Sequence, residues 1–123
     1  MEDLIARISA ETGVEPATAQ KAVGLILAFL RKEGPQAEVD ALFAAIPGAA
    51  EAAAVGNGGA SGGLLGAIGG GLMGLAGQLT GLGLGMGQMQ TIGRQVFAYA
   101  RGKAGDEAVG QVVAAIPGLG QFL

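Results

Sequence analysis

The pentapeptide AAIPG occupies residues 44–48 and recurs at residues 114–118, seventy positions later. The same offset places AFLR at residues 28–31 over AYAR at residues 98–101, and no gap is needed between the two matches. A chain rich in glycine and alanine gives scattered matches by chance, but it does not easily give an identical five-residue phrase in register with a second match. We therefore interpret the two halves of the chain as an internal duplication.

The first half contains three segments whose apolar residues recur at helical spacing, and we predict helices over residues 1–12, 17–33 and 36–45. Gly13 is typical of a helix end, and Pro16 suits a helix start because a first-turn residue needs no backbone donor. Gly34 and Pro35 together stop the second helix and precede the third. Residues 22–30 carry no charge, which predicts that the second helix is buried on nearly all sides.

The second half is expected to repeat this arrangement, with helices over residues 72–82, 86–103 and 105–115. A three-helix unit of this size has too little core to be stable alone, so the two units are expected to pack face to face. The predicted fold is all-α, a bundle of about six helices built from two tandem three-helix repeats with pseudo-two-fold symmetry. The predicted organisation is a first unit at 1–55, a Gly-rich joint at 56–71 and a second unit at 72–123, within one compact domain.

The third helix of each unit supplies the predicted repeat core. Its inward residues occupy equivalent positions in the two halves: Leu42, Phe43 and Ile46 in the first, and Val112, Val113 and Ile116 in the second. Their helical spacing puts them on one face of each helix.

The residue inventory argues against an enzyme. The chain has no His, Cys or Trp, one Tyr and two Ser, so it cannot assemble a catalytic triad, a thiol nucleophile or an imidazole base. The chain has no His or Cys to bind a transition metal, and none of its loops has the residue spacing of a calcium site. A G-x-G-x-x-G match at residues 69–74 has no preceding strand and no acidic residue about twenty positions on. We therefore predict no catalytic residue, no cofactor and no metal.

Fifteen of the 25 glycines lie between residues 56 and 87. Four of them fall at four-residue steps and form a candidate helix-contact ridge: Gly62, Gly66, Gly70 and Gly74. After a three-residue step, Gly77, Gly81 and Gly85 continue the series, and such a ridge lets another backbone approach closely. Three interpretations remain open: a flexible linker, best matched by 56–63; a packed helix over 64–82; or a membrane segment over 64–86.

Charge and cysteine content limit the partners and the compartment. The net charge is −3, and the seven basic residues are dispersed without interleaved aromatics, so no nucleic-acid partner is expected. The acidic start of the chain lacks the basic and apolar regions of a secretory signal, which predicts a cytoplasmic location with membrane association as an alternative. The absence of cysteine gives no information on redox compartment.

The chain resembles an uncharacterised bacterial family, the VcgC/VcgE-type proteins of unknown function. In the first half the resemblance lies in residues 12–14, 19–20, 24–30 and 45–48. In the second half it lies in a glycine-leucine run followed by residues 81–84 and 97–100. The resemblance implies an all-helical fold. It carries no activity, ligand or catalytic residue.

The leading hypothesis for function is a non-enzymatic interaction or assembly protein, a homo-oligomer that uses its apolar helix faces and glycine ridge. The chain has much apolar surface but few aromatic residues. Such a composition often leaves exposed apolar patches that bind a partner. The alternatives are a membrane-associated protein that inserts residues 64–86, with lipid contact, and a carrier of a small apolar ligand.

Overall fold

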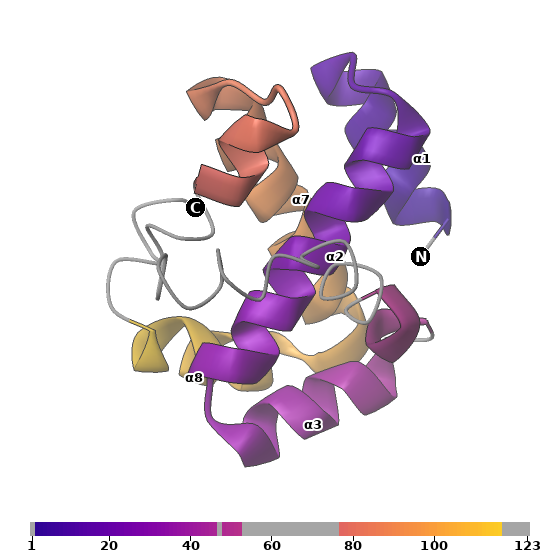
Figure 1. Cartoon of the computed structure of the whole chain (residues 1–123). Helices are drawn as coiled ribbons and strands as arrows, with labels where there is room; N and C mark the ends of the chain where they lie inside the picture. Colours follow the sequence, from indigo (N-terminus) through magenta and orange to yellow (C-terminus); the bar gives the residue numbers. More distant parts are fainter. Residues whose placement is uncertain (1, 47, 53–76, 117–123) are drawn as a thin grey trace.

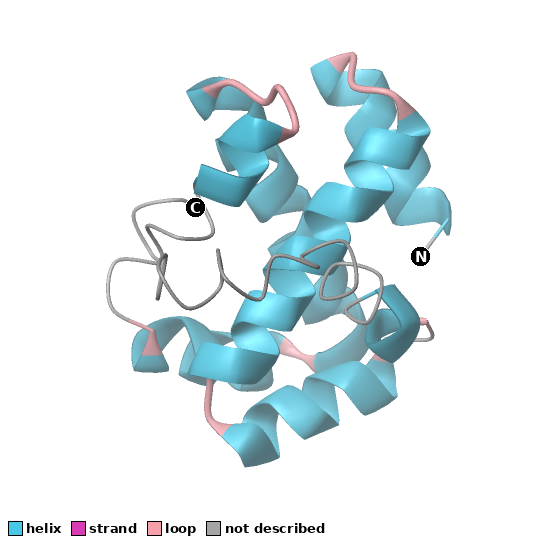
Figure 2. Cartoon of the chain, in the orientation of Figure 1, coloured by secondary structure: helices cyan, strands magenta, loops and turns pink. Residues whose placement is uncertain are grey.

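The computed structural model describes residues 2–46, 48–52 and 77–116 of the 123-residue chain. Within these ranges the chain forms helices joined by short turns, without a strand (Figure 2). The main helices are α1 (Glu2–Thr12), α2 (Pro16–Glu33), α3 (Gln36–Ala45), α7 (Met86–Ala104) and α8 (Asp106–Ala115). Residues 49–52 and 77–81 are also helical. The predicted all-helical class is confirmed.

Glycine and proline set the turn between α1 and α2. Gly13 has a φ of +71°, a conformation that residues with a Cβ rarely adopt, and its N–H donates to the Ser9 carbonyl at 2.9 Å. Pro16 then opens α2. Gly83, which precedes α7, has a φ of +88°. A glycine with positive φ therefore lies before both α2 and α7.

Corresponding helices of the two halves begin seventy residues apart. α2 begins at Pro16 and α7 at Met86, while α3 and α8 have the same length of 10 residues. Ile46 follows α3 with φ −106° and ψ 108°, and Ile116 follows α8 with φ −106° and ψ 111°. The third helices therefore start and stop at matching sequence positions, and the second helices start at matching positions, although α7 ends one residue later than the offset from α2 gives.

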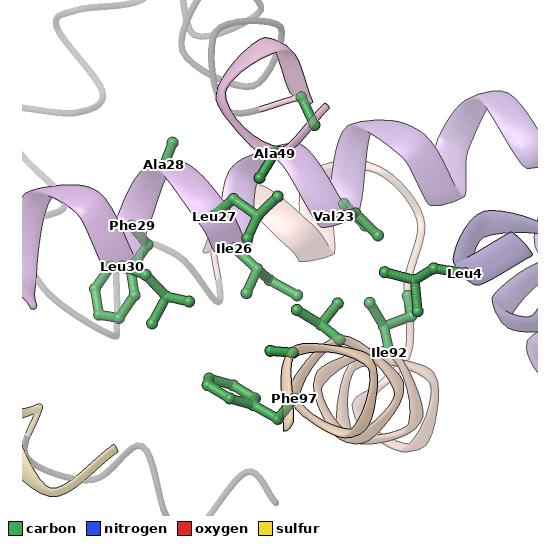
Figure 3. Packing of buried hydrophobic residues seen from close by; sticks show 14 of the residues in the cluster. Leu4, Val23, Ile26, Leu27, Ala28, Phe29, Leu30, Ala49, Ile92 and Phe97 are labelled. Atoms are coloured by element: carbon green, nitrogen blue, oxygen red, sulfur yellow. The ribbon is translucent and has the colours of Figure 1, made fainter. Parts of the chain in front are cut away.

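The core lies between helices from the two halves. α1 packs against α2 and α7, and α3 packs against α2, α7 and α8. In Figure 1, α2 runs diagonally across the molecule and α7 lies behind it. Figure 3 shows Ile92 of α7 beside Leu4 of α1 and below Val23 of α2, and both Ile92 and Phe97 belong to the buried cluster that includes Ile26 and Leu30 of α2. Each half thus covers the apolar face of the other.

The middle of α2 is buried on nearly every side, as its uncharged sequence predicts. All residues from 22 to 30 are buried except Leu25, which is half-buried. Ala49, from the helical segment 49–52, lies beside Leu27 and adds to this cover (Figure 3).

Gly34 ends α2 in a position that has no space for a side chain. A Cβ there would lie 2.6 Å from the Leu30 carbonyl oxygen and 2.7 Å from Cγ2 of Val39. We expect Gly34→Ala to lower the free energy of unfolding by about 1–3 kcal/mol, because the turn or Val39 must shift. Urea unfolding followed by circular dichroism measures the change.

The matched control is Gly110→Ala within α8, where a Cβ would meet nothing within 4 Å. This change is expected to stabilise the protein by up to about 1 kcal/mol, since alanine is the better helix former. Equal effects of the two substitutions would contradict the role assigned to the crowded turn.

Candidate functional site

Exposed helix faces are the features of the described residues that could serve a function. Across residues 2–46, 48–52 and 77–116, no three His, Cys, Asp or Glu side chains gather in a way that holds a metal ion. In the same part of the chain no polar or charged side chain is buried. The candidate functional site is therefore sought among the exposed faces of the helices.

The predicted repeat core falls into two groups. Four residues are buried, with exposed fractions of 1%, 2%, 0% and 4%: Leu42, Ile46, Val112 and Ile116. Phe43 and Val113 are half-buried and pack against the edge of the same cluster. Each lies one residue after a buried position, which rotates its side chain by about 100° toward the helix edge.

The candidate glycine ridge at Gly62, Gly66, Gly70 and Gly74 lies outside the described residues. Gly77 and Gly81, which continue it, are exposed, and a Cβ at either would meet nothing within 4 Å. Residues 64–76 of the membrane interpretation also lie outside the described part. Among the helices that are described, none is both long and apolar enough to cross a membrane.

Two glutamine side chains join α1 to α7. Gln88 donates from Nε2 to the Thr12 carbonyl at 3.1 Å and accepts the Gly85 N–H at its Oε1, at 2.8 Å. Gln95 donates from Nε2 to Oε2 of Glu11. Sequence reasoning missed both contacts. The only available signal was the seven-residue spacing of the glutamines, which places them on one face of α7.

Small side chains are among the exposed residues of α3 and α8, which pack against each other. On α3 the exposed residues are Ala37, Ala41 and Ala44, and on α8 they are Gly110 and Ala114. We call these five residues the small-residue row. Because none of them extends beyond Cβ, another helix can approach the backbone here more closely than at a face of long side chains.

One face of α7 is also exposed to solvent. Arg94, Ala98 and Arg101 are exposed at helical spacing, whereas Gly24 and Ala28, seventy residues before the first two, are buried in α2. Within the described part of the chain, no ion pair involves Arg94 or Arg101. We call Arg94, Ala98 and Arg101 the basic face of α7.

Comparison of the chain with protein-family models, with curated proteins and with solved structures found no match.

Proposed function

We propose that this chain is a non-enzymatic helical module that self-associates. The observation that carries the proposal is the small-residue row on α3 and α8. Exposed Ala and Gly residues occur on both of these adjacent helices, and closely packed helix contacts favour such small side chains. The residue inventory, without His or Cys, supports an interaction role over a catalytic one.

The architecture that we propose for the module is two tandem three-helix repeats in a six-helix bundle with pseudo-two-fold symmetry. The matching positions of α2 with α7, and of α3 with α8, support it. So does burial, since Val39 and Val109 are 1% and 0% exposed. Membership of the VcgC/VcgE-type family and a cytoplasmic location remain part of this proposal, and both rest on the sequence alone.

Self-association is tested by light scattering coupled to size-exclusion chromatography at micromolar concentration. We expect a mass of at least twice the 12.0 kDa of one chain. The double variant Ala41→Arg with Ala114→Arg is expected to lower this mass, because two long charged side chains then project from the row.

The matched control is Ala10→Arg, an exposed position on α1 outside the row, which should keep the wild-type mass. A strictly monomeric wild-type protein would contradict the proposed function. An unchanged mass in the double variant would show that the row is not the contact.

A further inference from the structure

The helices of the two halves bury their apolar faces against each other. α1, α2 and α3 of the first half each pack against α7, and α3 also packs against α8. One buried cluster contains residues of both halves, among them Leu30, Ile92 and Val109, each 0% exposed. Because the chain has no cysteine, no disulfide joins the halves. Each half is therefore a binding surface for the other, held by packing.

Two hydrogen bonds add chemical direction to this contact. Gln95 donates from Nε2 to Oε2 of Glu11, and Gln88 donates from Nε2 to the Thr12 carbonyl at 3.1 Å. Both donors belong to α7 of the second half, and both acceptors belong to α1 of the first half.

The equivalent positions of the first half have the same burial but different chemistry. Gln88 and Gln95 correspond to Thr18 and Leu25 of α2, seventy residues earlier, and all four side chains are half-buried. Leu25 has no donor, and the side chain of Thr18 is shorter than that of a glutamine. The amide donors that reach α1 are therefore a property of the second half alone.

A pair of like halves lacks these bonds. In the two-repeat architecture proposed above, two first halves set Leu25 against Glu11. Two second halves set Gln95 against Gly81, the residue equivalent to Glu11, which has no side chain. A carboxylate that packs against an apolar side chain loses solvation without gaining a donor, so the like pairing of first halves is disfavoured.

We infer that the two halves are complementary binding partners, and that Gln88 and Gln95 direct a first half to a second half in preference to a like half. The packing that joins them does not need the peptide connection, so the halves bind each other as separate chains. The partner that the first half fits is thus a three-helix unit that carries both glutamines. The inference rests on the proposed repeat architecture and does not depend on self-association through the small-residue row.

Cleavage of the folded protein tests the inference. A recognition site for a specific protease is inserted between residues 59 and 60, which lie outside the described part of the chain, and is cut after the full chain has folded. Native mass spectrometry at micromolar concentration is expected to show one first-half piece with one second-half piece. Unfolding the cut protein in urea and diluting it lets the pieces choose partners again, and the unlike pair is expected to predominate.

The variant Gln88→Thr with Gln95→Leu gives the second half the residues of the first. After dilution from urea, the ratio of unlike to like pairs is expected to fall at least about tenfold, because both hydrogen bonds are lost. The matched control is Gln111→Ala on α8, which also replaces an exposed glutamine by its counterpart, Ala41. It should keep the wild-type ratio.

A second measurement separates pairing from helix stability, since Gln88 also accepts the Gly85 N–H at the start of α7. Glu11→Ala and Gln95→Ala are made singly and together, and the dilution at which the cut complex dissociates is compared. The double variant is expected to weaken pairing by less than the product of the two single effects, because both changes remove the same bond.

Three outcomes would overturn the inference. The first is separation of the cut pieces with loss of helix content by circular dichroism, which would mean that the halves bind only within one chain. The second is like pairs as frequent as unlike pairs, and the third is independent effects of Glu11 and Gln95. The mass of the intact chain by light scattering decides self-association separately: a monomeric intact chain whose cut pieces stay paired contradicts the proposed function and leaves this inference standing.

Discussion

Replacing Ile46 or Ile116 with Asp is expected to unfold the protein. The two side chains are 2% and 4% exposed, and the backbone N–H of each donates to the preceding helix, to Leu42 at 3.1 Å and to Val113 at 3.3 Å. A carboxylate at either site would be buried among apolar side chains without a partner. Such a group costs several kcal/mol, a large part of the stability of about 5–15 kcal/mol that a small domain possesses.

Far-ultraviolet circular dichroism during heating measures this loss. Ala115→Asp is the matched control, because Ala115 is exposed and directly precedes Ile116. Ile116→Val, which removes one methylene, is expected to cost only about 1 kcal/mol and separates lost packing from buried charge. Near-native melting of both Asp variants would show that the helix faces have been assigned wrongly.

Phe97→Ala is expected to lower the free energy of unfolding by about 3–5 kcal/mol. Phe97 is 2% exposed and belongs to the buried cluster that α7 shares with α2 (Figure 3). Truncation removes an aromatic ring from the contact between the two halves and leaves a cavity that a closely packed interior closes only in part. Urea denaturation gives the value directly.

Phe43→Ala makes the same chemical change at a half-buried site on α3. We expect it to cost less than half as much, because its ring already touches solvent on one side and packs only against the edge of the core. Equal losses at the two positions would mean that α2 and α7 are not packed as described.

Local chemistry explains why the first three helices can be predicted closely. The predicted helix at 36–45 matches α3, and the one at 17–33 differs from α2 by a single residue at its start. Each boundary has a cause within a few residues, such as the positive φ of Gly13 or the crowded Gly34. In the second half the local signals are weaker, and the seventy-residue offset supplied the boundaries of α7 and α8.

The candidate surfaces could not be predicted because they depend on how the helices lie against one another. Gly24 and Arg94 occupy equivalent positions, yet one is buried and the other exposed. Similarly, Gln88 meets the Thr12 carbonyl 76 residues away, a distance in sequence over which no periodic pattern specifies a partner. Residue type predicts which side chains avoid water, whereas tertiary packing decides which exposed faces remain free.

The packing of α1 on α7 and of α3 on α8 also has a consequence for how the chain folds. Helical proteins generally fold fast because their contacts are local in sequence, but these contacts join residues from opposite ends of the chain. During synthesis the first three helices emerge well before their partners exist. The side of α2 that packs against α7 therefore has no partner until α7 has been made, whereas α1 and α3 are available to α2 from the start.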